Sequence, residues 1–224
     1  MPLLDYGHID LDFSGNEPYI KPFDIIPFCK NGAITNSIKC NYKLLKNKII
    51  PEILTAINIL HSNKLVHRDI KPGNIYMYDD VILLADFGTT SDIINKTACG
   101  YTLTRRQTPG YSAPEISENY YVVASDYYSF GCTIAALYNK EEHVYQELLN
   151  KRKEFDVRIE IKRIGLPLKC PTHESDLQLL VDSLTIGDEK TRAGYDDVKI
   201  WLYGRPDIFF LKWKDRLDFT RAYK

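Results

Sequence analysis

The chain has 224 residues, 44% of them hydrophobic, and a formal net charge of −1. This length favours one compact domain, and the near-neutral charge gives no electrostatic reason to expect nucleic acid or a membrane as a partner. The five cysteines include no CxxC pair, and neither a signal peptide nor an apolar run of about 18 residues is present, so we expect a soluble, cytoplasmic protein without a disulfide framework or zinc site.

The N-terminal half predicts short strands followed by one helix. Apolar runs separated by Gly, Pro and Asn in residues 1–29 predict two or three short strands joined by turns. Apolar residues then recur at helical spacing, which predicts a buried helix over 44–62 that Pro51 either kinks or begins.

The second half predicts a helical body after a strand-rich stretch. Residues 63–90 contain strand-like pieces separated by polar loops, and residues 91–120 form a long Thr-rich loop. A loop of that length inside a compact domain is usually functional. Four helices are predicted after it, at 125–138, 141–155, 174–184 and 194–204.

The segment HRDIKPGN, residues 67–74, places an acid, a cation and an amide on one loop between two strands. Phosphoryl transfer needs a carboxylate to orient the attacking hydroxyl, a cation beside the phosphate and hard oxygen ligands for magnesium. Asp69, Lys71 and Asn74 would supply these groups in that order.

Two further motifs follow the loop in chain order. Asp86-Phe87-Gly88 comes directly after an apolar strand, so a second magnesium ligand, Asp86, is expected to face the same loop. The segment TPGYSAPE, beginning at Thr108, closes the long loop, and SDYYSFG, beginning at Ser125, opens the next helix.

Taken together, HRDIKPGN, DFG, TPGYSAPE and SDYYSFG resemble the catalytic loop, magnesium loop, substrate-docking loop and central helix of eukaryotic-type protein kinases, over roughly residues 1–205. One such motif alone carries little weight, but four in order at these intervals leave little room for chance. The resemblance implies an α+β, protein-kinase-like fold with a mainly α-helical C-lobe and a few short N-terminal strands.

The resemblance also implies a role for each matching residue. Asp69 would be the catalytic base and Lys71 a phosphate contact, while Asn74 and Asp86 would bind Mg²⁺, or Mn²⁺ in its place, together with ATP. Lys71 combined with Thr108 in the docking loop resembles the branch specific for Ser and Thr, so the expected acceptor is a Ser or Thr of a protein substrate.

Further residues would support or regulate the site. His67 and Phe87 of the DFG motif, which Gly88 completes, would stack in an internal spine, and Asp126 would hold the backbone of the catalytic loop. Arg68 marks control by phosphorylation of the long loop, since a phosphate would give this arginine a partner. The remaining residues implied are the phosphorylation site Thr104, with Thr97, Thr102 and Thr108 left as alternatives, and the structural pair Glu115 and Arg192.

The nucleotide site would begin at the hinge between lobes. In the resemblance Ile26 is the gatekeeper, and Pro27, Phe28 and Cys29 line the adenine edge. Tyr76 would form the floor of the adenine site, where aliphatic residues are the family norm.

The sequence departs from the family upstream of the hinge. It contains no GxGxxG loop, no VAIK-type lysine and no helix bearing the glutamate partner of that lysine; Lys21 is better explained as a surface residue. The expected division is a remnant of the small lobe with the hinge at 1–29, a C-lobe at 30–204 and an extension at 205–224. Because the missing groups position the phosphates, activity of the chain alone should be lower by several orders of magnitude.

Three functions remain open on this basis. The first is a Ser/Thr kinase that is truncated or completed in trans, with a partner chain or second copy covering the exposed strands of residues 1–29. The second is a pseudokinase-like interaction module without catalysis. The third, a small-molecule kinase of the aminoglycoside or choline type, is disfavoured by TPGYSAPE.

Overall fold

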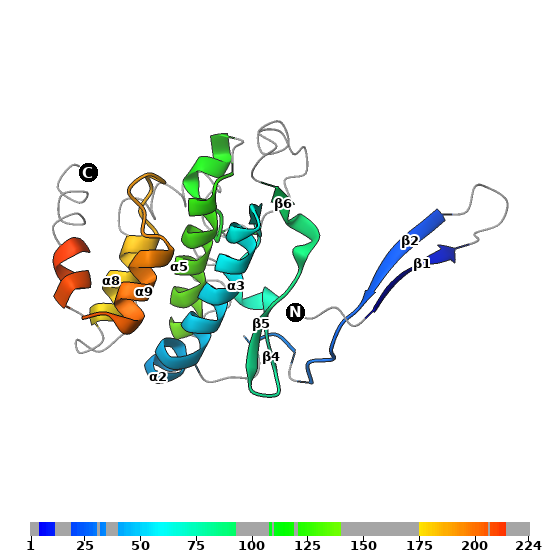
Figure 1. Ribbon diagram of the computed structural model, residues 1–224, viewed down its shortest axis with the longest axis horizontal. Coiled ribbons are helices and arrows are strands. Elements are labelled where there is room, and N and C mark those ends of the chain that lie inside the picture. The colour runs from blue at the N-terminus through cyan, green and yellow to red at the C-terminus, as the bar shows by residue number, and fades with distance from the viewer. Residues whose placement is uncertain are drawn as a thin grey trace, which may run out of the picture.

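The computed structural model describes residues 5–11, 19–30, 32–34, 40–92, 108, 110–118, 121–139, 175–205 and 207–213. At the N-terminus, strands β1 (Asp5–Leu11) and β2 (Tyr19–Ile25) form an antiparallel ribbon in which Asp5 pairs with Ile25. Within the described residues these strands pair only with each other, and the ribbon extends away from the helical body (Figure 1). The prediction of short strands in this region is confirmed.

The predicted helix over 44–62 is confirmed, and it starts slightly earlier. Helix α2 (Tyr42–Leu44), a π-helical segment (Leu45–Ile49) and α3 (Ile50–Ser62) follow one another without a break. Asn41 caps the start, because its side chain accepts a backbone N–H at 2.9 Å. Pro51 lies in the first turn of α3 and has no backbone N–H to donate to a carbonyl of the preceding turn. The π-helical segment before it is wider than an α-helix and accommodates the missing hydrogen bond.

Two small antiparallel strand pairs follow α3. Strand β3 (Leu65–Val66) pairs with β6 (Ser91–Asp92), and β4 (Ile75–Tyr78) pairs with β5 (Val81–Leu84). The loop between β3 and β4 and the loop between β5 and β6 therefore lie at neighbouring strand ends. Single 3₁₀ turns occupy Pro72–Asn74, Phe87–Thr89 and Pro114–Glu118.

Three of the four helices predicted in the second half are present. They are α5 (Val123–Asn139), α8 (Ser175–Leu184) and α9 (Tyr195–Tyr203). The predicted helix at 141–155 lies outside the described residues. Residues 207–213 are also helical, and Phe209 and Trp213 are buried in the same core as α5 and α8.

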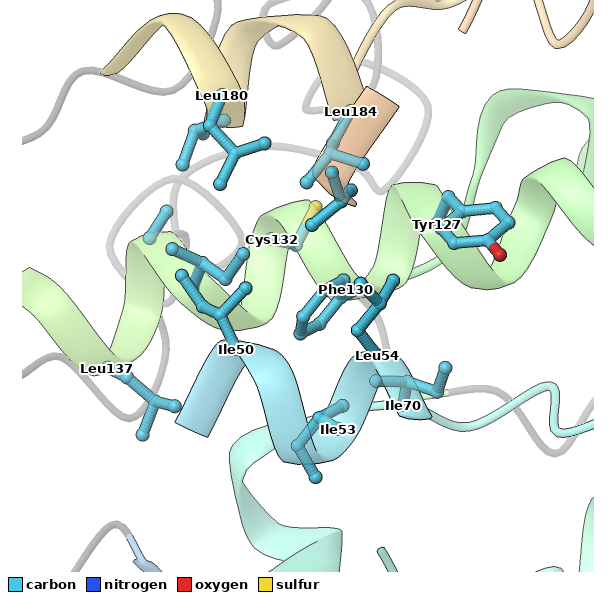
Figure 2. Close-up of a cluster of buried hydrophobic side chains, with 14 of the residues drawn as sticks. Ile50, Ile53, Leu54, Ile70, Tyr127, Phe130, Cys132, Leu137, Leu180 and Leu184 are labelled. Carbon is cyan, nitrogen blue, oxygen red and sulfur yellow. The ribbon is translucent and has the colours of Figure 1, made fainter. Parts of the chain in front are cut away.

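The core is organised around α5, which lies between α3 and α8 (Figure 2). Ile50 and Leu54 of α3 pack toward Phe130 of α5, while Leu180 and Leu184 of α8 contact its other side. A Cβ atom at Gly131 would lie 2.8 Å from the Leu184 Cβ, so α5 and α8 approach this closely only because position 131 is glycine. Each fully buried large side chain stabilises the fold by roughly 1.5–3 kcal/mol.

In the part of the chain that the structure describes, no helix is both long and apolar enough to cross a membrane.

Candidate active site

The loop between β3 and β4 positions a buried carboxylate with three donors. Asp69 is 9% exposed, and its carboxylate accepts hydrogen bonds from Lys71 Nζ at 2.7 Å, Thr108 Oγ1 at 2.9 Å and Asn74 Nδ2 at 3.0 Å. Lys71 Nζ also donates to Thr108 Oγ1 at 2.7 Å. The carboxylate and ammonium groups of this loop thus meet the hydroxyl of Thr108, which lies 39 residues after Asp69 in the sequence.

The backbone of this loop is held by one carboxylate of α5. Asp126 is completely buried and accepts the backbone N–H groups of His67 and Arg68, each at 2.9 Å. It also accepts the Tyr121 hydroxyl at 3.0 Å and lies 2.8 Å from His61 Nε2. Arg68 has a φ of 75°, a left-handed conformation that costs a non-glycine residue free energy, and these bonds offset that cost.

Two oxygen groups that could hold a divalent cation lie at the neighbouring strand ends. Asp86 follows β5, and Ala85 N donates to Asn74 O at 2.9 Å, which joins the two loops. Asn74 Nδ2 donates to the carbonyl and carboxylate of Asp69, and among the described residues nothing engages Asn74 Oδ1. Within the part of the chain that the structure describes, the exposed Asp86 carboxylate accepts only the Gly88 N–H, at 3.4 Å. A free amide oxygen and a nearly free carboxylate suit the hard-oxygen preference of Mg²⁺ or Mn²⁺.

The family model described as the protein kinase domain matches residues 25–201. The chain belongs to the protein kinase family. The match begins at the predicted hinge, so the upstream part of the resemblance over 1–205 lies outside it. The match adds no support for a kinase of the aminoglycoside or choline type, which TPGYSAPE already disfavours.

Curated protein kinases resemble parts of the chain. Serine/threonine-protein kinase PknG of Mycobacterium leprae is 45% identical over 86 residues, 38% of this chain and 10% of that protein. Calcium-dependent protein kinase 6 of Plasmodium berghei is 29% identical over 167 residues, 68% of this chain and 11% of that protein. Calcium/calmodulin-dependent protein kinase type 1 of Caenorhabditis briggsae is 32% identical over 126 residues, 49% of this chain and 33% of that protein. The matched regions therefore span a third of these relatives or less.

In this kinase domain the rings of His67 and Phe87 meet edge to face, with centroids 5.3 Å apart. His67 Nε2 lies 3.1 Å from the Ala85 carbonyl, and burial lowers the pKa of His67, which favours the neutral ring. Phe87 is half-exposed on its other side. A Cβ atom at Gly88 would lie 3.2 Å from Asp86 Oδ1, which favours glycine beside that carboxylate.

A buried ion pair joins the segment before α5 to the segment before α9. Arg192 donates to Glu115 through both terminal nitrogens, at 2.7 and 2.9 Å, although the residues are 77 positions apart. Burial acts to raise the pKa of Glu115, but the hydrogen bonds and charge of Arg192 outweigh it and hold the pKa below its ordinary value. Three backbone carbonyls accept the remaining guanidinium donors, at Ala124, Ile186 and Gly187.

At the predicted hinge, buried and exposed residues alternate. Pro27 and Cys29 are buried, whereas Ile26 is exposed and Phe28 is 82% exposed. The Cys29 carbonyl accepts the N–H of Gly32 at 2.9 Å, which closes the turn after the hinge. Tyr76, the predicted floor, is half-buried on β4 and forms a bridge with Ala33.

The sequence did not predict some of the contacts in this region, and one predicted site residue lies outside the described residues. The pattern gave no signal that His61 and Tyr121 would share the carboxylate of Asp126. It also missed Ser125, whose hydroxyl donates to Glu115 at 2.7 Å. Thr104 and its alternatives Thr97 and Thr102 lie outside the described residues.

Proposed function

We propose that this chain transfers the γ-phosphate of ATP to a Ser or Thr hydroxyl of a protein substrate. The supporting observation is that Asp69 lies within hydrogen-bond distance of both a hydroxyl, from Thr108, and a cation, from Lys71. An acceptor hydroxyl that replaced Thr108 at this carboxylate would be oriented for attack, with Lys71 beside the transferring phosphate. This is the positioning and charge stabilisation on which phosphoryl transfer depends.

In this proposal the nucleotide and its metal lie between the hinge and the loops after β3 and β5. Asn74 Oδ1 and the Asp86 carboxylate would hold Mg²⁺, or Mn²⁺, which supplies positive charge to the phosphates. Pro27, Phe28 and Cys29 would border the adenine, and Tyr76 would form the floor of its site.

The proposed division remains a small-lobe remnant with hinge at 1–29, a C-lobe at 30–204 and an extension at 205–224. The groups that cover the phosphates would come from outside this sequence, from the same protein or in trans, because residues 1–224 contain no GxGxxG loop. The segment or chain that supplies these groups would cover three exposed side chains, Ile25, Ile26 and Phe28. Phosphorylation at Thr104, paired with Arg68, would regulate the assembled kinase.

The test is phosphate transfer from labelled ATP to Ser, Thr and Tyr peptides. We expect slow, Mg²⁺-dependent transfer to Ser and Thr peptides, reduced at least about 100-fold by Asp69→Asn. Asp207→Asn, which changes an exposed carboxylate outside the site, is the matched control. Transfer that is equally fast in wild type and Asp69→Asn would exclude Asp69 as the base.

The second candidate is an interaction module without catalysis, favoured by the exposed hinge and by the absent phosphate-covering motifs. It predicts tight binding of a protein partner with no Mg²⁺-dependent binding of ATP. The proposed kinase predicts that Mg²⁺ strengthens ATP binding and that Asp86→Ala removes this effect.

A further inference from the structure

The short hairpin of β4 and β5 connects the two residues proposed to hold the metal. Asn74 directly precedes β4, and Asp86 lies two residues after the end of β5. Ala85 N donates to Asn74 O at 2.9 Å, so the placement of this hairpin sets how Asn74 and Asp86 lie relative to each other. A hairpin with four residues in each strand is marginally stable by itself, and its surroundings must hold it in place.

The outer edge of β5 presents a backbone donor to helix α3. Along a strand of an antiparallel pair, successive N–H groups point alternately toward and away from the partner strand. The N–H of Ala85 points toward the β4 side, since it donates to Asn74, so the N–H of Ile82, three residues earlier, points away from β4. Ile82 is buried, and a buried N–H that lacks an acceptor costs free energy.

Glu52, in the first turn of α3, supplies the acceptor for this N–H. Its Oε2 atom accepts the N–H of Ile82 at 2.5 Å. Its Oε1 atom accepts a hydrogen bond from Lys48 Nζ at 3.2 Å, four positions earlier in the chain. A hydrogen bond to a charged acceptor is stronger than one between neutral groups, so this carboxylate is a firm attachment point for β5.

Lys48 contacts the turn of the same hairpin. Its ammonium group donates to the backbone carbonyl of Asp80 and lies 3.3 Å from the Asp80 carboxylate. The Asp80 side chain is 97% exposed, so the ion pair itself contributes little to stability. The bond from Ile82 to Glu52 is therefore the main polar attachment of the hairpin to α3, and Lys48 supports it.

Apolar packing holds the same strand in a less specific way. Ile82 and Leu84 of β5 are buried in the core that α3 also lines. Burial of apolar surface is non-directional, whereas a hydrogen bond weakens steeply when its angle or distance changes. The core therefore keeps β5 against α3, and the bond to Glu52 fixes the orientation of its backbone.

We infer that Glu52 is a positioning residue that holds the β4–β5 hairpin, and with it Asn74 and Asp86, in the arrangement described above. The inference rests on the proposed function, because that function assigns Mg²⁺ to these two residues. Losing the carboxylate removes the charged acceptor of the Ile82 N–H, loosens the bond between Ala85 and Asn74, and weakens the Mg²⁺-dependent binding of ATP.

The first test is hydrogen exchange on the full chain, measured residue by residue without nucleotide or metal. In Glu52→Ala, the amide of Ile82 should exchange about tenfold faster, because its acceptor is lost. The amide of Ala85 should exchange about threefold faster, because the hairpin moves relative to Asn74. Unchanged exchange at Ala85 in this variant would overturn the inference.

The matched control for this test is Asp176→Ala. The side chain of Asp176 is 33% exposed, against 32% for Glu52, and it also pairs with a lysine. It contacts Tyr42 and Lys46 rather than the hairpin, so the amides of Ile82 and Ala85 should keep their rates. Acceleration as large as in Glu52→Ala would mean that general destabilisation, and not the bond to Ile82, causes the effect.

Two further variants separate the hydrogen bond from the side chain that carries it. Glu52→Gln keeps an oxygen that accepts the N–H of Ile82, so exchange at Ile82 should stay within about twofold of wild type. Glu52→Met keeps the length of the side chain without an acceptor, and it takes the place of Glu52→Ala should that variant fold poorly. Exchange at Ile82 that is as fast in Glu52→Gln as in Glu52→Met would contradict a role for the hydrogen bond.

Calorimetric titration with ATP then tests the link to the metal site. Mg²⁺ should strengthen ATP binding by wild type, and Glu52→Met should reduce this gain about threefold, less than the roughly 10-fold or more lost with a group bonded directly to a metal ligand. Glu52→Gln and Asp176→Ala should keep the gain. An undiminished gain in Glu52→Met would refute the link. Should wild type show no Mg²⁺-dependent binding, the proposed metal site fails, while exchange at Ala85 still decides whether Glu52 positions the hairpin.

Discussion

The catalytic loop and the hinge differ sharply in how this chain holds them. Asp69 and Asp126 are buried and accept three and four close contacts from side chains and backbone. At the hinge, Ile26 and Phe28 are exposed, and within the described residues the β1–β2 ribbon pairs only with itself. The helical body therefore organises its own chemical groups, whereas the side chains of Ile26 and Phe28 are left largely exposed.

Breaking the ion pair of Arg192 and Glu115 should have the largest effect on the stability of the helical body. In Arg192→Met the Glu115 carboxylate stays buried without its partner, so the free energy of unfolding should fall by about 3–5 kcal/mol. Urea denaturation measures this loss. The control is Arg205→Met, which removes an arginine of an exposed pair and should leave the unfolding midpoint unchanged. A loss below about 1 kcal/mol in Arg192→Met would show that the pair is not structural.

Removing the charge of Asp126 should have the next largest effect on stability. Asp126→Asn removes the charge that accepts the backbone N–H groups of His67 and Arg68, so we expect a loss of about 2–3 kcal/mol in urea denaturation. Asp176→Asn provides a comparison, because this carboxylate accepts Tyr42 and Lys46 in a partly exposed site and should cost less. Equal losses in the two variants would contradict a special role for Asp126.

A fall in pH should destabilise the helical body, because it protonates Glu115. Because its pKa is lowered in the folded state, the pair contributes stability that is full above the ordinary carboxyl pKa, about 4.3, and is lost as pH falls toward the folded value. The free energy of unfolding, measured from about pH 6 to about pH 3, should fall less steeply in Glu115→Gln. Identical slopes would mean that another carboxylate dominates.

The smallest effect is expected at the hinge. Phe28→Ser changes a side chain that is 82% exposed, so the free energy of unfolding should stay within about 0.5 kcal/mol of wild type. A larger loss would show that the hinge is as organised as the catalytic loop. Sedimentation should show weaker self-association of the variant, if a second copy covers this edge.

The sequence predicted best the features that depend on local spacing. Apolar periodicity located α3, α5, α8 and α9, and Pro51 marked the change of helix geometry. The motif around Asp69 predicted that Lys71 and Asn74 lie near it, because all three belong to one tight loop.

Contacts between distant residues of common types were not predictable. Nothing near His61 in the chain indicates that it reaches Asp126, 65 residues later, since this contact depends on how α3 packs against α5. The bond between Glu52 and the N–H of Ile82 likewise depends on how α3 packs against β5. The sequence also gives no sign of the left-handed backbone at Arg68, whose N–H donates to Asp126.

Calorimetric titration of the chain with ATP, in the presence and absence of Mg²⁺, tests most directly whether the proposed metal and nucleotide site binds ATP. Wild type should bind ATP more tightly with Mg²⁺, Asp86→Ala should lose this difference, and Asp207→Ala should keep it. ATP binding that is unaffected by both Mg²⁺ and Asp86→Ala, or no binding by the wild type, would contradict a metal and nucleotide site built on Asn74 and Asp86.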